Sequence, residues 1–194
     1  MRVKHYLTGL LLWITVLGNS CKPDARTAEP GTTLPASKVV LNPQTGLVYY
    51  LDQPFSGSSE SFYTNGQRAS RITYLDGKKE SLEQKWFLTG IKSYEATYAK
   101  GKLHGISRTW WSNGHLRTKY QYKQGKANGT QWQWYSNGAK FKKMNLVDGK
   151  EEGLQQSWRK NGKIYNNYEA KNGRIFGLKR SKLCFKLDNE QVLY

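Results

Sequence analysis

The chain has 194 residues, and its 31 lysines and arginines against 14 aspartates and glutamates give a formal charge of +17. A positive field of this size attracts anions and speeds the encounter with anionic partners. The chain has only three histidines, and none lies at a metal-ligand spacing from cysteine, histidine or a carboxylate, which argues against a metal centre or an acid–base active site.

Residues 1–20 have the layout of a secretory signal peptide. A basic opening, MRVKH, precedes an apolar run from Tyr6 to Leu17 that is too short to span a membrane. Small residues then lead into Cys21, which predicts a lipoprotein whose first mature residue is the lipidated Cys21. Two alternatives stay open, namely plain secretion with cleavage nearby and an uncleaved anchor.

Residues 21–38 continue as a predicted flexible tether. After Cys21 the sequence reads KPDARTAEPGTTLPASK, with three prolines, small polar residues and no apolar period. Such a composition cannot build a core. Together, the signal and the tether predict a membrane-anchored lipoprotein of the cell envelope that faces the periplasm or the exterior. Loss of Arg2 and Lys4 with the signal leaves 29 basic residues against 14 acidic ones.

Residues 39–177 are predicted to form an array of 24-residue repeats. Three glycine columns and one aromatic column recur at this period without slippage, which indicates a repeat architecture. The columns are Gly66, Gly90, Gly114, Gly138 and Gly162; Gly77, Gly101, Gly125, Gly149 and Gly173; Gly57, Gly105, Gly129, Gly153 and Gly177, with Ser81 in the missing place; and Phe62, Trp86, Trp110, Trp134 and Trp158.

The first two glycine columns predict the turns of β-hairpins. Asn-Gly and Asp-Gly favour two-residue type I′ turns, because both central residues need a positive φ. The structural turn glycines are therefore Gly66, Gly114, Gly138 and Gly162 in Asn-Gly pairs, and Gly77 and Gly149 in Asp-Gly pairs. The intervening stretches of roughly ten residues are rich in aromatic and β-branched types, as strands are. The predicted fold is all-β, with hairpins forming an extended, curved antiparallel meander sheet.

Parity predicts which way the side chains point. Strand residues alternate between faces and 24 is even, so equivalent residues of all repeats share a face. Even positions hold the Phe62–Trp158 column and further apolar columns such as Ile72, Ala96, Tyr120, Met144 and Tyr168. Odd positions are mostly polar, apart from the aromatic column Tyr63, Phe87, Trp111 and Tyr135. The expectation is one aromatic core face at even positions and one wet face at odd positions.

Residues 178–194 are predicted to be a C-terminal capping segment, because a sixth repeat begins at Gly177 but lacks the Asn-Gly pair. If Cys21 is acylated, Cys184 has no partner and is most simply a small buried apolar residue. A Cys21–Cys184 disulfide is the alternative if no lipid is attached.

The repeated pattern G-x-x-x-x-[FW]-[YWF]-x-N-G, followed by [DNQK]-G-[KR], resembles the MORN-repeat variant family, in particular the bacterial type labelled as YwqK-type antitoxins. The resemblance covers about residues 47–177, and GLVYYLDQPFSG at 46–57 is similar to the family's usual opening. It implies a MORN-like β-hairpin fold. The antitoxin label implies a partner toxin but is tied to no residue of this chain.

The charge distribution suggests where a partner binds. Residues 96–147 contain no acidic residue but many lysines, arginines and aromatic rings. The exposed odd aromatics Trp111 and Tyr135, together with Lys119, Lys123 and Lys142, form the predicted ligand-binding strip, in which rings give contact area and lysines give salt-sensitive attraction.

The predicted function is that of a non-enzymatic, envelope-anchored scaffold. It has no predicted catalytic residue, cofactor, metal or small-molecule substrate, and it binds a protein or an anionic envelope component such as a glycan or lipid headgroup. Nucleic acid is disfavoured because the signal removes the chain from the cytoplasm. The alternatives are an antitoxin that neutralises a partner toxin and a purely structural envelope lipoprotein.

Overall fold

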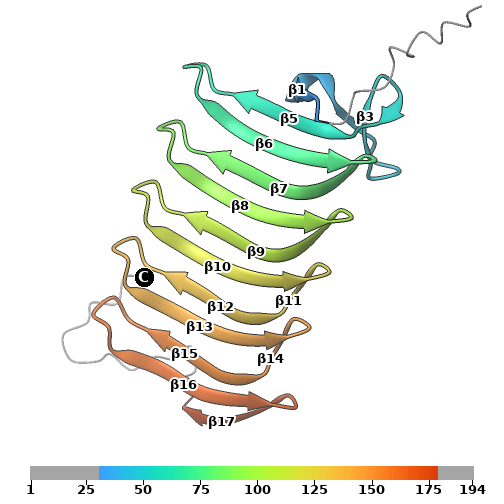
Figure 1. Ribbon diagram of the computed structural model, residues 1–194. Coiled ribbons are helices and arrows are strands. Elements are labelled where there is room, and N and C mark those ends of the chain that lie inside the picture. Colours follow the sequence, from blue (N-terminus) through green and yellow to red (C-terminus); the bar gives the residue numbers. More distant parts are fainter. Residues whose placement is uncertain (1–30, 179–194) are drawn as a thin grey trace, which may run out of the picture.

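The computed structural model describes residues 31–178, so the predicted signal peptide, Cys21 and Cys184 lie outside the described part of the chain. Within it, the predicted all-β meander is confirmed: one long sheet runs in the order β1-β5-β6-β7-β8-β9-β10-β12-β13-β15-β16-β17, and from β5 onward neighbouring strands are antiparallel (Figure 1). Among the described residues, no helix is long and apolar enough to cross a membrane.

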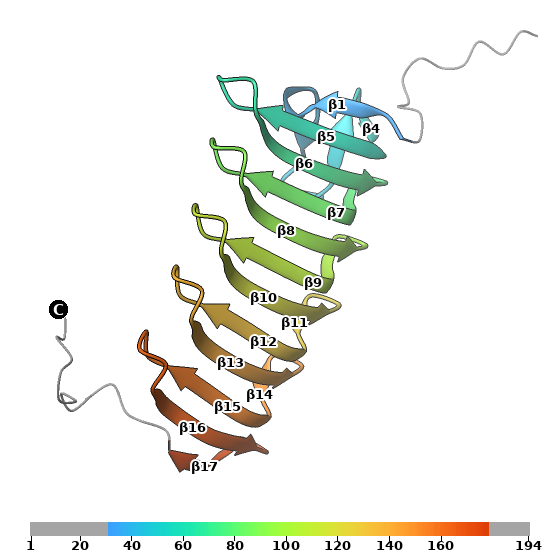
Figure 2. The same ribbon diagram turned by 60° about the vertical axis from the view of Figure 1, so that its left-hand side comes forward.

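The strands of the repeats follow the 24-residue period. They are β5 (Gly57–Phe62), β6 (Arg68–Leu75), β7 (Lys78–Trp86), β8 (Lys92–Ala99), β9 (Lys102–Trp110), β10 (Leu116–Lys123), β11 (Lys126–Ala127), β12 (Gly129–Trp134), β13 (Lys140–Val147), β14 (Lys150–Glu151), β15 (Gly153–Trp158), β16 (Ile164–Lys171) and β17 (Arg174–Leu178). Turned by 60°, the same sheet shows each hairpin stacked on the preceding one in a single layer (Figure 2).

The Asp-Gly column forms the predicted type I′ turns. Both central residues have a positive φ in every repeat, for example 49° at Asp148 and 83° at Gly149. The Asn-Gly column is different, and here the prediction of type I′ turns is wrong. Asn137 has no positive φ; only Gly138 does, at 83°.

The Asn-Gly loops are instead three residues long. The Tyr135 N–H donates to the carbonyl of Ala139, and the Gly138 N–H donates back to the carbonyl of Tyr135. The Asn137 Oδ1 accepts the Ala139 N–H at 3.1 Å. This is a turn followed by a left-handed glycine, the usual three-residue hairpin loop. The asparagine is therefore selected for its side-chain hydrogen bond rather than for a left-handed backbone.

Even-numbered residues do not all lie on one face of the sheet, so the expectation of a core face made of even positions is wrong. A two-residue turn pairs residues of opposite parity, as in Val147 with Lys150, so even residues of one strand share a face with odd residues of the next. Gln131 thus lies opposite Met144, and Trp132 opposite Lys143.

We call one side the tyrosine face and the other the tryptophan face. The tyrosine face carries Ile72, Tyr74, Ala96, Tyr98, Tyr120, Tyr122, Met144, Leu146, Tyr168 and Ala170 on the even positions of β6, β8, β10, β13 and β16, with the odd positions of β5, β7, β9, β12 and β15 beside them. The tryptophan face carries the Phe62–Trp158 column together with Leu82, Ile106 and Leu154. The even apolar columns are thereby split between the two faces.

One buried position recurs in each repeat, is polar and lies on the tyrosine face. It is filled by Ser59, Glu83, Ser107, Gln131 and Gln155. The amide of Gln131 receives the Gln121 N–H and donates to the Gln121 carbonyl, both at 3.0 Å, and Gln155 holds the backbone of Asn145 in the same way. The amides of Gln131 and Gln155 thus take the place of backbone hydrogen bonds between strands beside Gly129 and Gly153 of the third glycine column.

An N-terminal cap covers the first repeat. Strand β1 (Thr33–Pro35) runs parallel to β5, and a 3-10 turn at Ala36–Lys38 follows it. The predicted tether over 21–38 therefore ends before β1 rather than at Lys38. Strands β2 (Val40–Leu41), β3 (Val48–Tyr50) and β4 (Gln53–Pro54) make a separate small sheet. The cap buries the cluster of Val48, Phe55 and Tyr74.

Candidate ligand-binding face

The tryptophan face combines aromatic rings with cations along much of the array. Trp132 stacks on Trp134 at a centroid distance of 5.8 Å and on Trp158 at 6.2 Å, with interplanar angles of 19° and 12°. The three rings form a continuous aromatic ridge across β12 to β15. Trp134 and Trp158 belong to the Phe62–Trp158 column, whose members are each the last residue of the strand before a loop of the first glycine column.

Lysines and arginines cover these rings. The Lys140 Nζ lies 5.7 Å from the Trp132 centroid and 5.9 Å from that of Trp158, and the Lys143 Nζ lies 5.5 Å from Trp132. Arg68 over Trp86 and Lys92 over Trp110 repeat the arrangement in earlier repeats. Such contacts orient the cations and keep them at the surface.

In the first repeats, carboxylates of the chain itself neutralise this face. The Glu95 carboxylate contacts the Lys92 Nζ at 2.6 Å and the Arg108 guanidinium at 3.3 Å. It also accepts a hydrogen bond of 3.0 Å from Gln84. The hydrogen bond from Lys92 is the main cause that holds the pKa of Glu95 below its usual range. Glu60 pairs similarly with Arg68 at 3.3 Å and with Arg71 at 3.6 Å.

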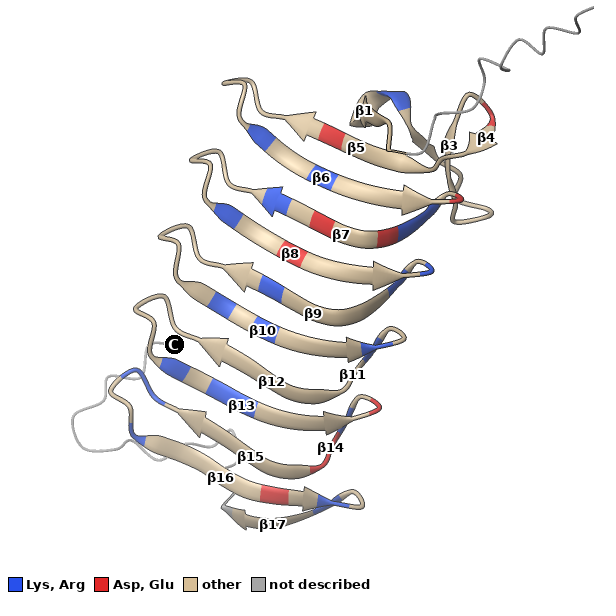
Figure 3. Cartoon of the chain, viewed as in Figure 1, with Lys and Arg blue, Asp and Glu red and all other residues tan. Residues whose placement is uncertain are grey.

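On β10, β12 and β13, the same face has cations without carboxylates, because residues 96–147 contain no Asp or Glu. The residues one and two periods after Glu95 are Lys119 and Lys143. Lys119 lies directly opposite Arg108 on β9 and opposite Trp132 on β12, which in turn lies opposite Lys143. We call Arg108, Lys119, Lys140 and Lys143, with the tryptophan ridge, the basic ladder. Figure 3 shows the run of basic positions on β9, β10 and β13 between the acidic positions of the earlier and later strands.

The basic ladder has an electrostatic imbalance. Like charges that face each other across neighbouring strands destabilise a sheet. Lys119 faces Arg108, yet within the described residues neither Lys119 nor Lys143 has an ion pair. An external anion bound here would relieve this repulsion.

The structure does not bring the predicted ligand strip together. Lys119 and Lys123 lie on the tryptophan face, whereas Lys142 lies on the tyrosine face opposite Gln133 and Ser157. Trp111 and Tyr135 are half-buried, and they reach the next repeat: the Trp111 Nε1–H donates to the Trp134 carbonyl at 3.2 Å and the Tyr135 hydroxyl to the Trp158 carbonyl at 2.9 Å.

Trp111 and Tyr135 therefore make structural contacts with the next repeat, which the alternation of side chains between faces did not predict. Burial raises the pKa of the Tyr135 hydroxyl, as expected for a group packed between repeats. Of the five predicted residues, Lys119 alone belongs to the basic ladder. Sequence reasoning missed the grouping of Arg108, Lys140 and Lys143, and the signal that points to it is the parity exchange at each two-residue turn.

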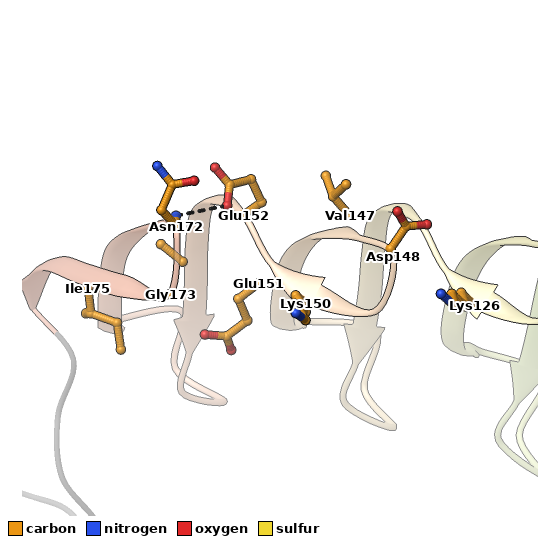
Figure 4. Close-up of a pocket in the computed structure, with 10 residues that line it drawn as sticks. Lys126, Val147, Asp148, Lys150, Glu151, Glu152, Asn172, Gly173 and Ile175 are labelled. Atoms are coloured by element: carbon orange, nitrogen blue, oxygen red, sulfur yellow. Dashed lines mark hydrogen bonds between the residues drawn. The ribbon is translucent and has the colours of Figure 1, made fainter.

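Hollows in the surface lie at the Asp-Gly margin of the sheet. One of about 260 Å³ is lined by His104, Tyr122 and Lys123. A wider one, of about 1040 Å³, lies between the last turns, where the Glu152 carboxylate accepts the Asn172 N–H at 3.3 Å (Figure 4). Within residues 31–178, no group of three or more His, Cys, Asp or Glu is placed to hold a metal ion.

Glu151, one of the residues that line the wider hollow, contacts a tyrosine. The Tyr168 hydroxyl donates to both oxygens of Glu151, at 2.9 and 3.0 Å. Burial and then this hydrogen bond raise the pKa of Tyr168 to about 12. A tyrosine held neutral in this way fixes the margin of the sheet and is poorly suited to proton transfer near neutral pH.

Comparison with known proteins agrees with the repeat geometry. No curated protein matches the sequence. The profile of the family described as MORN repeat variant matches residues 56–76 and 103–124, and each match spans a hairpin unit of the sheet. Two hairpins of the long sheet thus match the MORN repeat variant directly, which supports a MORN-repeat family for the array.

Proposed function

We propose that this protein is a non-enzymatic scaffold of the cell envelope, anchored by a lipid on Cys21, that holds an anionic partner on the basic ladder. The observation that carries the proposal is the change along one column of the tryptophan face, from Glu95 to Lys119 and Lys143. The chain pairs the cations of this face with its own carboxylates in the first repeats and leaves those of β10 and β13 for a partner. The MORN-repeat architecture supports a binding role through its broad sheet surface.

Neighbouring residues of β13 provide a matched test of the face. Lys142 and Lys143 follow each other but point to opposite sides of the sheet. A photo-crosslinking residue at position 143, in cells that express the full chain, is expected to trap an anionic envelope component in a salt-sensitive manner. The same residue at position 142 is expected to trap none. Equal capture from both positions, or capture from 142 alone, contradicts the assignment of the face.

Anchoring is tested separately. Radiolabelled fatty acid is expected in the wild-type protein and absent from Cys21→Ala, which should also leave the membrane fraction. Label that persists in Cys21→Ala overturns the anchor without affecting the assignment of the basic ladder. A crosslinked product at position 143 that proves to be a secreted toxin protein would favour the antitoxin alternative.

A further inference from the structure

We infer that the occupant of the basic ladder is a linear polysaccharide with carboxylate groups, laid along the array axis across β9 to β13. This inference rests on the proposed function and specifies the chemistry of the partner. It is carried by three features of the tryptophan face: the carboxylates that already occupy its first half, the spacing of its cations, and the contacts that its tryptophans already make within the chain.

The first feature is a template within the chain. The Glu95 carboxylate sits between Lys92 and Arg108, and the Glu60 carboxylate between Arg68 and Arg71. Each carboxylate thus contacts two cations: Glu60 contacts two of the next strand, and Glu95 contacts one of its own strand and one of the next. Strands β10 and β13 keep cations of this kind in Lys119, Lys140 and Lys143 but supply no carboxylate, and the carboxylate that contacts Arg108 is that of Glu95. A carboxylate of the ligand would form ion pairs with these cations, as Glu60 and Glu95 do with the cations of the earlier repeats.

The second feature is the spacing of the charges. Neighbouring strands lie about 4.8 Å apart, so Arg108 and Lys119 are one spacing apart and Lys119 and Lys143, on either side of β12, are two spacings or about 10 Å apart. A β-linked pyranose unit advances its chain by close to one strand spacing. In an extended two-fold chain, alternate carboxylates point the same way and therefore recur at close to two spacings.

An acidic peptide fits this spacing less well. In an extended peptide, side chains on one side recur at roughly 6.8 Å, which matches neither one strand spacing nor two. The two surface hollows described above are lined by residues near the Asp-Gly margin and by none of the four cations of the ladder.

The third feature argues against single-stranded nucleic acid. Binding of that kind uses bases stacked on open aromatic faces. Trp132 stacks on Trp134 and on Trp158, and the Nζ atoms of Lys140 and Lys143 lie near its ring, so the ring already has partners within the chain. The ridge offers cations beside these rings, and cations suit the carboxylate groups of a sugar chain.

The experiment compares the full-length chain, purified in detergent, with two single charge reversals. Lys119→Glu places a carboxylate opposite Arg108, as Glu95 is in the preceding repeat, so this variant is expected to fold with an unchanged or raised melting temperature. Lys102→Glu removes the same charge at the Asp-Gly margin, outside the ladder. Binding is measured with a β-linked oligomannuronate, and the neutral oligomannose of the same length and linkage is the control.

Wild type and Lys102→Glu are expected to bind the oligomannuronate alike and to lose it with added salt, whereas Lys119→Glu loses about tenfold or more in affinity. The neutral sugar is expected not to bind. Oligothymidylate, polyglutamate and phosphatidylglycerol vesicles are the competing probes. Tighter binding of one of these, lost in Lys119→Glu, overturns the polysaccharide but keeps the proposed function. Equal loss in both variants, or no binding of any anion, overturns both.

Discussion

Each residue of the Asn-Gly loop has its own physical role. Gly138 has a φ of +83°, and a Cβ added there would meet only the His115 ring, at 3.8 Å. Space is therefore not the reason for glycine at this position; the left-handed backbone is. Asn137 has an ordinary φ and contributes its Oδ1 to the Ala139 N–H.

The two residues should accordingly respond differently to the same substitution. Gly138→Val is expected to lower the free energy of unfolding by about 1–3 kcal/mol, because a β-branched residue is strained at positive φ. Asn137→Val loses one hydrogen bond of the loop and is expected to cost about 1 kcal/mol or less. Urea unfolding measures both. If Asn137→Val proves the more damaging, the backbone assignment of this loop is wrong.

Pairs of repeats are joined by side chains as well as by the strand ladder. The Tyr63 and Tyr135 hydroxyls and the Trp111 indole each donate to the carbonyl of the Trp column 23 residues further on. This explains why an aromatic with a polar tip precedes the loop in these repeats. An amphipathic ring can pack between hairpins and still donate its hydrogen bond.

Tyr135→Phe isolates this hydrogen bond. It removes the hydroxyl but keeps the ring against Phe141, whose centroid lies 4.9 Å away. The expected loss is about 1 kcal/mol in the free energy of unfolding, and Tyr135→Ala is expected to lose about 3 kcal/mol or more because the ring is lost as well. Thermal and denaturant melts test this. A Tyr135→Ala variant as stable as wild type would return Tyr135 to the role of a surface ligand contact.

Glu83 takes the buried polar position that glutamine takes in two later repeats. Its side chain is 2% exposed and contacts the Lys79 Nζ at 2.7 Å and the Lys85 Nζ at 3.2 Å. Burial acts to raise the pKa of Glu83, but the hydrogen bond and charge of Lys79, with smaller contributions from Tyr98 and Lys85, outweigh it and leave the pKa lowered. The carboxylate is thus stabilised in the folded protein relative to the unfolded chain.

The sign of this shift sets the direction of a pH effect. A lowered folded-state pKa contributes stability that is present above the unfolded pKa, about 4.3, and is lost as the pH falls through the folded value. Glu83→Gln removes this contribution and keeps a side chain that fits the site at Gln131 and Gln155. Stability of the variant is expected to fall less than that of wild type upon acidification from pH 6. Parallel stability curves over this range would show that Glu83 carries no such linkage.

The elements were predictable from the sequence to different degrees. The period, the hairpins, and the type I′ turns at Asp76-Gly77 and Asp148-Gly149 follow from local chemistry, and the structure has them. The grouping of residues on each face did not follow. It depends on the parity exchange at two-residue turns and on the extra residue opposite each Trp strand end, such as Phe141 between the pairs Gln133–Lys142 and Trp134–Lys140. The basic ladder was missed for this reason, although each of its four cations lies in the acid-free window of residues 96–147.

At the scale of the whole molecule, the sheet is a single layer whose stability is concentrated unevenly. The large buried hydrophobic cluster lies under the N-terminal cap, at Val48, Phe55 and Tyr74. Backbone hydrogen bonds join this cap to the first Asp-Gly turn, from the Val48 N–H to the Gly77 carbonyl and from the Gly77 N–H to the Phe55 carbonyl. In an array where each repeat contacts mainly its neighbours, such a cap protects one end.

Two phenylalanines seven residues apart test this arrangement. Phe55 is 1% exposed, and its ring lies 5.9 Å from that of Tyr74, whereas Phe62 is 57% exposed on the tryptophan face. Phe55→Ala is expected to lower the free energy of unfolding by about 3–5 kcal/mol, and Phe62→Ala by less than about 1 kcal/mol. Hydrogen exchange in Phe55→Ala should show lost protection at Val48 and the first hairpin, with amides of β12 to β16 retained, because the damage spreads only through neighbour contacts. Uniform loss of protection along residues 31–178 would mean that the sheet unfolds as one unit, with the cap essential to all of it.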